Sequence, residues 1–306
     1  MKHSYNKSVI IICGPTAVGK TSVAISLAKH FTTEIISADS RQCFQELNIG
    51  VARPSPAELK EVPHHFIASH SIHENINAAW FENYALEKVN ELFNGHDTVI
   101  MVGGTGLYIK AFCEGMDEIP SIDGSVRNEI IKNYEAKGLE WLQNEIKEKD
   151  PQFFEAGEIK NPQRIMRALE VVKSTGQSIF DFRKNKMTER PFRIIKIGLE
   201  LPKEELHNNI NVRVDKMIDD GLVEEVRSLL PFRDLNALQT VGYAEIFGFI
   251  DGKITLTTAI EEIKKNTRQY AKRQMTWFKK DKEINWIEAK QVDHIINTAQ
   301  KLVNAI

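Results

Sequence analysis

Three features of the sequence predict an α/β fold in which a parallel sheet is flanked by helices and interrupted by a mainly helical insertion domain. Short β-branched apolar runs alternate with helix-period segments in the first third of the chain. Charge-rich helical segments with little strand character then fill residues 119–191. Strand character returns at 192–201. We therefore expect an α/β core built from 1–118 and 192–306, with the insertion between them.

The first expected strand, residues 9–12, runs into a turn with a phosphate-binding motif. The segment GPTAVGKT places Gly14, Gly19, Lys20 and Thr21 at every fixed position of G-x-x-x-x-G-K-[ST], and a helical pattern follows. Backbone N–H groups in such a turn face an anion, the lysine adds a charge, and the helix N-terminus adds roughly half a unit of positive charge. The motif predicts a phosphate-loop NTPase-like core, with a Thr21 hydroxyl available to Mg²⁺. A dinucleotide-binding turn is disfavoured because G-x-G-x-x-G is missing.

Two further strands are expected to end beside this turn. The run 34–38 leads into Asp39, and the run 98–102 opens into the turn GGTG, which contains Thr105. Because ligands of open α/β sheets bind at the carboxyl ends of the strands, we expect Lys20, Asp39 and Thr105 around one crevice.

The chemistry of this crevice differs from that expected of a nucleotide-hydrolysing enzyme. Such an enzyme favours an acid at the end of an apolar strand to help hold Mg²⁺, but the run 98–102 ends in Gly103. One carboxylate and one hydroxyl near a phosphate are better suited to removing a proton from a nucleophile. At this point Asp39 could also be a helix N-cap or an outer Mg²⁺ contact, and Thr105 a simple turn residue.

The remaining core elements are expected after the insertion. The segment 192–201 re-enters the sheet, long helices follow at about 203–230 and 257–280, and 284–288 forms a last edge strand.

Two basic runs in helical segments indicate a polyanionic partner, although a solvated helix face would explain either run alone. Because the net charge of the whole chain is −2, a polyanion would have to be bound by these basic runs rather than by the overall charge of the protein. The first run contains Lys264, Lys265, Arg268, Lys272, Arg273, Lys279, Lys280 and Lys282, and the second contains Lys160, Arg164, Arg167, Lys173, Arg183, Lys184, Lys186 and Arg190.

Other sequence features limit the class of protein. A hydrophobic content of 42% and a charged content of 27% are typical of a globular protein, and no apolar stretch is long enough for a membrane span. The N-terminal segment MKHSYNK leads into a strand without a signal-peptide core. The three cysteines lack C-x-x-C spacing, which argues against disulfides and zinc and favours a reducing cytoplasm. Capping or packing roles are expected for His64, His65, His70 and His73.

Six ordered motifs resemble the tRNA dimethylallyltransferase family: GPTAVGKT, SADSRQCFQELNIGVARP, VGGTGLYIKA, NPQRIMRALEV, VGYAEI and AKRQMTWFK. Members of that family transfer a five-carbon dimethylallyl group from its diphosphate to the exocyclic amine of the adenosine 3′ to the anticodon. The resemblance implies a phosphate-loop core, a helical insertion that grips the anticodon stem-loop, and Mg²⁺ as cofactor. We expect a monomeric cytoplasmic enzyme of bacterial type.

The resemblance also implies roles for individual residues. Asp39 would be the general base toward the adenine amine, and Thr105 would orient that amine and the leaving oxygen. The donor diphosphate would be held by Gly14, Pro15, Thr16, Ala17, Val18, Gly19, Lys20, Thr21 and Arg213, with Mg²⁺ placed by Thr21. The tRNA would be contacted by Asp39, Ser40, Arg41, Gln42, Thr105, Arg127, Gln163, Arg164, Ile165, Met166, Arg167, Gln239, Thr240, Val241, Gly242, Tyr243 and Ala244.

The chain departs from the family pattern at five positions: Phe44, Val51, Arg53, Asn209 and Ala244. These departures affect the expected tRNA contacts and, at Asn209, the positive charge expected beside Arg213 at the diphosphate site. They leave Lys20, Asp39 and Thr105 unchanged. Two other functions stay open from the residues alone. A small-molecule kinase also uses a phosphate loop and an aspartate beyond the second strand, and a nucleotide-gated RNA-binding protein would need the basic surfaces without the chemistry.

Overall fold

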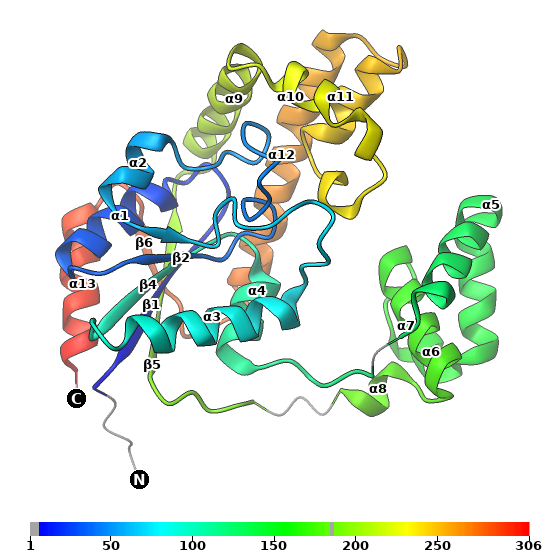
Figure 1. The fold of residues 1–306 in the computed structure, drawn as a ribbon, viewed down its shortest axis with the longest axis horizontal. Coiled ribbons are helices and arrows are strands. Elements are labelled where there is room, and N and C mark those ends of the chain that lie inside the picture. Colours follow the sequence, from blue (N-terminus) through cyan, green and yellow to red (C-terminus); the bar gives the residue numbers. More distant parts are fainter. Residues whose placement is uncertain (1–5, 121, 184–186, 306) are drawn as a thin grey trace. The chain divides into compact units, whose positions relative to one another are not determined.

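The larger part of the chain folds around a parallel sheet (Figure 1). This computed structural model describes residues 6–120, 122–183 and 187–305. Within these residues the sheet has six strands in the order β3-β2-β4-β1-β5-β6, and every neighbouring pair is parallel. The predicted parallel α/β core is confirmed. The strands are β1 (Ser8–Cys13), β2 (Ile35–Ser37), β3 (His64–His65), β4 (Thr98–Val102), β5 (Arg193–Glu200) and β6 (Asn285–Glu288).

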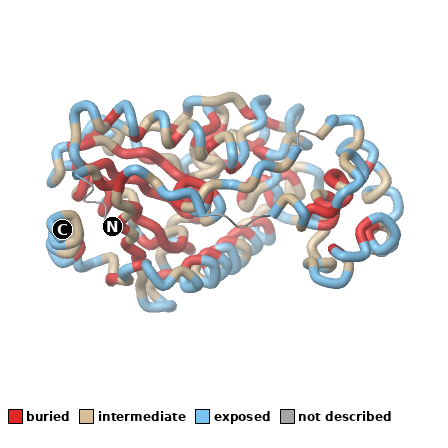
Figure 2. The backbone as a smooth tube through the Cα atoms, turned by 90° about the horizontal axis from the view of Figure 1, so that it is seen from below, coloured by how far each residue is buried: buried red, intermediate tan, exposed pale blue. Residues whose placement is uncertain are grey.

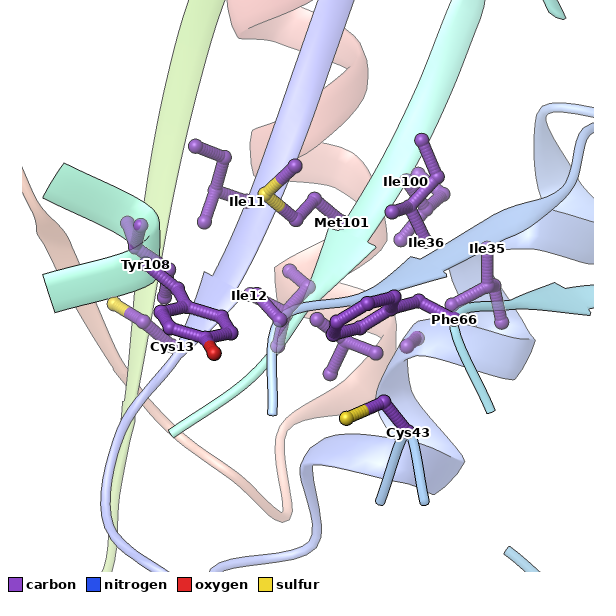
Figure 3. Close-up of a cluster of buried hydrophobic side chains, with 14 of the residues drawn as sticks. Ile11, Ile12, Cys13, Ile35, Ile36, Cys43, Phe66, Ile100, Met101 and Tyr108 are labelled. Atoms are coloured by element: carbon purple, nitrogen blue, oxygen red, sulfur yellow. The ribbon is translucent and has the colours of Figure 1, made fainter. Parts of the chain in front are cut away.

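The central strand β1 is buried along its whole length because helices cover the sheet. Ile10 lies opposite Ile100 of β4 on one side and Ile195 of β5 on the other. Figure 3 shows Ile11 next to Met101 of β4, its partner in the sheet, and Figure 2 shows buried segments in the interior with exposed segments around them. Apolar runs on neighbouring strands therefore fix the register at the centre of the sheet.

Helices pack against both faces of this sheet, most of them in the segments that connect one strand to the next. Figure 1 shows α3 and α4 across one face, while α1 packs with α13 and against β4. On the α3–α4 side, the rings of Phe81 and Tyr108 stack with centroids 4.7 Å apart. The helices of the core are α1 (Lys20–His30), α2 (Pro56–Glu61), α3 (Ala78–Leu92), α4 (Gly106–Glu114), α9 (Lys203–Asp219), α10 (Leu222–Ser228), α11 (Tyr243–Ile250), α12 (Leu256–Phe278) and α13 (Val292–Asn304), with 3-10 turns at Leu230–Phe232 and Asn236–Leu238.

Two elements differ from the sequence prediction. The expected helix at 203–230 is broken into α9 and α10, because Gly221 adopts a left-handed φ of 100° that ends one helix and starts the next. The strand β3 was not predicted, since two residues are too few to form a periodic pattern. Elsewhere the predicted strands at 9–12, 98–102 and 284–288 match β1, β4 and β6 closely.

A second compact unit runs from Glu114 to Thr188, compared with the predicted insertion at 119–191. Its described residues form helices and no strand. Ile130, Ile165 and Leu169 lie in a hydrophobic core of its own. The helices are α5 (Gly124–Lys149, broken at Gly138), α6 (Pro151–Ala156), α7 (Pro162–Thr175) and α8 (Ile179–Phe182). Among all described residues, no helix has the length and apolar character needed to cross a membrane.

Candidate active site

The phosphate loop connects β1 to α1 and is shaped by two glycines. Gly19 takes a left-handed φ of 97° at the N-terminus of α1. Gly14 has a φ of 138°, and a Cβ there would lie 2.6 Å from the carbonyl oxygen of Leu199. Lys20 folds back over the loop, where its Nζ donates hydrogen bonds to the carbonyls of Gly14 at 3.1 Å and Pro15 at 2.8 Å. The loop therefore folds around its lysine.

Two cations at this loop lack an acidic partner among the described residues. Neither Lys20 nor Arg213 of α9 forms an ion pair there, although Arg213 Nη2 donates to Thr16 Oγ1 at 2.6 Å. The Arg213 Nε is buried without a hydrogen-bond acceptor. Burial lowers the pKa of Lys20 to about 8, against the opposing effect of the nearby Asp39 carboxylate. The loop therefore holds positive charge that a bound anion would stabilise.

Asp39 follows β2 and uses one carboxylate oxygen to shape its own turn. Its Oδ1 accepts the backbone N–H groups of Arg41 at 2.9 Å and Gln42 at 3.2 Å. The side chain therefore closes an Asx turn rather than the helix N-cap left open by the sequence, because the described residues directly after Asp39 form a turn and not a helix. Within the described part of the chain, Oδ2 accepts no hydrogen bond. One oxygen of Asp39 is fixed, and the other is available to a ligand.

Thr105 ties the turn after β4 to the turn after β2. Its Oγ1 accepts the backbone N–H of Ser40 at 3.0 Å and donates toward Ser40 Oγ at 3.3 Å, and its own N–H donates to the Ala38 carbonyl at 3.3 Å. A Cβ at Gly103 would lie 2.2 Å from that carbonyl oxygen. Close packing of the two turns therefore requires glycine where a nucleotide-hydrolysing enzyme would place an acid.

A cleft opens beside the phosphate loop. It brings together Lys20 and Asp39, two of the three residues predicted to share a crevice, while Thr105 contacts Ser40 and is not part of the lining. The cleft is lined by Lys20, Thr21, Ser37, Asp39, Gln42, Pro54, His64, Ile67, Val102, Gly103 and Gly104.

Two residues of this region, Gln274 and His64, were not among the predicted site residues. Gln274 of α12 is buried; its Oε1 accepts the Thr16 N–H at 2.8 Å and its Nε2 donates to the Gly104 carbonyl at 2.9 Å. It joins the phosphate loop to the turn after β4. His64 lines the cleft, and its Nε2 is buried without a hydrogen-bond partner among the residues that the structure describes. The motif AKRQMTWFK contains Gln274, but the sequence could not show what this glutamine contacts.

Several predicted tRNA residues of the core have structural partners. Gln42 Nε2 donates to the carbonyls of Val51 and Ala52, and Arg41 reaches Asn236 at 3.4 Å. Arg53, one of the departures from the family pattern, donates to the carbonyls of Phe44, Gln45 and Leu47 and so shapes the same loop. Another departure, Asn209, reaches the Ala17 carbonyl of the phosphate loop at 3.4 Å.

The predicted segment 239–244 is only partly accessible. Gln239 and Ala244 are exposed, Thr240 and Val241 are half-buried, and Gly242 is buried. Tyr243 is fully buried and its hydroxyl donates to Glu225 Oε1 at 2.6 Å, so its side chain cannot contact tRNA in this structure. Burial gives the Tyr243 side chain a packing role, and the tRNA contact of segment 239–244 stays a prediction.

In the smaller unit, two predicted arginines share one buried acid. Arg127 Nη1 lies 3.2 Å from Glu170 Oε1, and Arg167 Nη1 lies 2.9 Å from Oε2. Arg164 pairs with Glu158 on the exposed side, and Gln163 is exposed. Ile165 and Met166 are buried in the core of this unit and pack there, and the tRNA contact of segment 163–167 stays a prediction.

The two basic runs differ in how much of their charge is free. In the first basic run, which lies on α12 and just after it, Lys264 and Lys279 form ion pairs with acidic residues. The other basic residues of this run have no acidic partner among the described residues. Arg190 is corrected: it is buried in the larger unit, where it pairs with Glu82 at 2.7 Å and does not add to a basic surface. Lys184 and Lys186 lie outside the described residues.

Known proteins resemble the chain over nearly all of its length. A model of the IPP transferase family matches residues 42–281. The tRNA dimethylallyltransferase of Cytophaga hutchinsonii is 48% identical over 290 residues, which cover 95% of each chain. That of Christiangramia forsetii is 50% identical over 280 residues, covering 92% of this chain and 93% of the relative.

Solved structures also resemble the chain over nearly all of its length. The tRNA isopentenylpyrophosphate transferase of Bacillus halodurans superposes with a TM-score of 0.72 at 32% identity and covers 97% of each chain. A eukaryotic dimethylallyltransferase solved acting on tRNA has a TM-score of 0.75 at 25% identity, covering 98% of this chain and 78% of that one. The chain belongs to the IPP transferase family.

Proposed function

We propose that the chain transfers a dimethylallyl group from dimethylallyl diphosphate to the exocyclic amine of the adenosine 3′ to the anticodon in tRNA, releasing diphosphate. One observation carries this proposal. Two cations, Lys20 and Arg213, have no acidic partner in the described part of the chain and lie at the phosphate loop, and the Asp39 carboxylate lines the same cleft as Lys20. Asp39 Oδ2 accepts no hydrogen bond from the described residues. An anion site beside a proton acceptor is what this reaction requires.

The diphosphate of the donor would sit against the phosphate loop. Backbone N–H groups at the start of α1, the Lys20 ammonium and the Arg213 guanidinium supply positive charge where the leaving group gains negative charge. Lys20 is already held by two carbonyls of the loop, so little rearrangement is needed. Asn209 contacts the loop but carries no charge, which leaves Arg213 as the cation from α9 at this wall.

The residues present fit a magnesium ion at the diphosphate. Thr21 lines the cleft and its hydroxyl makes no hydrogen bond to another described residue, so its oxygen is available as the hard ligand that Mg²⁺ prefers. When bound, the ion supplies charge that stabilises the departing diphosphate.

Asp39 would accept the proton. In the transfer, the bond between the diphosphate oxygen and the first allyl carbon breaks, and its electron pair leaves with the diphosphate. That carbon forms a bond to the exocyclic nitrogen, which releases one proton to Asp39 Oδ2. Oδ1 stays bound to the N–H groups of Arg41 and Gln42, which holds the carboxylate in place. Thr105 maintains this turn through Ser40.

The anticodon stem-loop would be bound by basic surfaces. The target base must leave its stack, which costs least in a single-stranded loop. At the core, the predicted residues Gln239 and Ala244 are exposed and Arg41 is half-buried. In the smaller unit, Arg127, Gln163 and Arg164 are exposed and Arg167 is half-buried. The protein would act as a monomer, because one chain supplies both the anion site and the proton acceptor. Its proposed place of action is the cytoplasm.

One assay separates this function from its alternatives. The protein is incubated with unmodified tRNA, labelled dimethylallyl diphosphate and Mg²⁺, and the tRNA is then digested to nucleosides. Prenylated adenosine at the position 3′ to the anticodon is the expected product. ATP-dependent phosphorylation of a metabolite without prenyl transfer would instead identify a kinase, and tRNA binding without any product would identify a pure binder.

A further inference from the structure

One wall of the cleft contains a histidine whose second ring nitrogen has no partner. His64 lies on the edge strand β3, opposite Ile35 of β2. Its Nδ1 is 2.8 Å from the Val62 carbonyl oxygen, and because a carbonyl only accepts, Nδ1 carries the hydrogen. In the neutral ring Nε2 is then a hydrogen-bond acceptor. This acceptor is buried and unpaired within the described part of the chain.

The next residue on β3, His65, differs from His64 because its Nε2 has a partner. Side chains alternate between faces along a strand, and His65 places its Nε2 2.6 Å from Glu34 Oε2. His65 is therefore satisfied within the protein. His64 instead shares the cleft with Lys20, Thr21 and Asp39. Since buried polar groups normally have partners, a ligand in the cleft is the natural partner of His64 Nε2.

The chemistry of the cleft restricts that ligand to a hydrogen-bond donor. A diphosphate oxygen only accepts, so it cannot satisfy the lone pair of His64 Nε2 directly. A magnesium ion keeps several of its waters when it binds to a protein, and these waters donate hydrogen bonds outward. Thr21, the residue that would ligate the ion, lines the same cleft.

We propose that His64 positions the hydrated divalent cation by accepting, at Nε2, a hydrogen bond from a water bound to the metal on the donor diphosphate. This role rests on the proposed function, because it assumes a metal-bound diphosphate in the cleft. His64 is a positioning residue: it does not touch the reacting atoms, and it orients the ion through one water. Loss of such an outer partner typically weakens metal affinity by about 10- to 100-fold.

The test measures binding without any transfer reaction. Isothermal titration calorimetry of inorganic pyrophosphate is carried out on the full chain, once with Mg²⁺ and once with EDTA. Two variants of similar volume are compared: His64→Leu removes the acceptor, and His64→Gln keeps one at the end of its side chain. His65→Leu and His65→Gln form the matched control pair, and the melting temperature of each protein checks folding.

His64→Leu is expected to bind magnesium pyrophosphate about tenfold or more weakly than the natural protein and to bind metal-free pyrophosphate equally well. His64→Gln should recover part of the loss, and the His65 pair should show no selective effect on the metal complex. Equal losses with and without Mg²⁺, or equal behaviour of His64→Leu and His64→Gln, would overturn the role of His64 while leaving the proposed function intact. Failure of the natural protein to bind magnesium pyrophosphate would overturn both.

Discussion

The hydroxyl of Thr105 accepts a hydrogen bond of 3.0 Å from the backbone N–H of Ser40. This contact joins the turn after β4 to the turn that begins at Asp39. The position of the proposed base therefore depends on a residue far along the chain, and neither turn is set by its local sequence alone.

Thr105→Val should slow transfer by misplacing Asp39. One hydrogen bond contributes about 0.5 to 1.5 kcal/mol, so we expect roughly a 3- to 10-fold fall in kcat. Donor affinity should change little, since Thr105 does not line the cleft. Single-turnover transfer and pyrophosphate titration measure the two quantities. Thr105→Ser keeps the hydroxyl and should retain most activity; if Val and Ser behave alike, Thr105 does not act through its hydroxyl.

Diphosphate affinity should fall as the pH rises above about 8. Burial lowers the pKa of Lys20 to about 8, so in the empty protein the ammonium is lost above this pH. A bound diphosphate favours the charged form and raises that pKa. Binding above pH 8 must therefore take up a proton, and affinity should drop by up to about tenfold per pH unit. Calorimetry in buffers of different ionisation enthalpy measures this uptake.

Lys20→Arg provides the control for this pH dependence, because arginine stays charged over the whole range. Its affinity for pyrophosphate should be flat between neutral pH and pH 9, whatever its absolute value. A natural protein whose affinity shows no drop and no proton uptake above pH 8 would show that Lys20 is charged when the site is empty.

Gln274→Leu should both destabilise the core and loosen the phosphate loop. It removes the acceptor of the Thr16 N–H and the donor to the Gly104 carbonyl. Leaving such buried groups unpaired costs about 1 to 3 kcal/mol each. Urea denaturation should show a lower midpoint, and pyrophosphate should bind more weakly. Gln291→Leu, at an exposed position, is the matched control and should leave both unchanged. Unaltered affinity in Gln274→Leu would mean that α12 does not support the loop.

Glu170→Gln tests whether tRNA affinity depends on the direction in which Arg127 and Arg167 are held or only on net charge. Glu170 is buried between Arg127 and Arg167. Removing its negative charge would strengthen tRNA binding if net charge alone mattered. We expect the opposite, a roughly 3- to 10-fold weaker affinity, because Arg127 and Arg167 each lose the charged partner that fixes the direction of the guanidinium group. Fluorescence anisotropy with tRNA over a salt series measures the effect.

The exposed pair of Arg164 and Glu158 supplies the control for Glu170. Glu158→Gln changes the net charge by the same amount without removing a buried partner, so it should leave tRNA affinity unchanged or slightly higher. Tighter binding by Glu170→Gln would contradict the orienting role.

The sequence predicted five of the six strands, and the residues at the carboxyl ends of β1, β2 and β4, because both follow from local patterns and parallel topology. Lys20 and Asp39 could therefore be placed in one cleft before the fold was known. The contacts of Gln274 could not, because α12 reaches the phosphate loop from more than 250 positions later in the chain. His64 was assigned to capping or packing, since only the sheet order reveals that β3 borders the cleft. Tyr243, Ile165 and Met166 were assigned to tRNA by motif, which does not show burial.

The most direct test of the account is transfer by Asp39→Asn. Asparagine keeps the Oδ1 acceptor that fixes the turn but cannot take the proton from the adenosine amine. Single-turnover prenylation of tRNA should fall by about 100-fold or more, while pyrophosphate affinity stays close to that of the natural protein. Unchanged turnover would remove Asp39 from the mechanism and contradict the central claim.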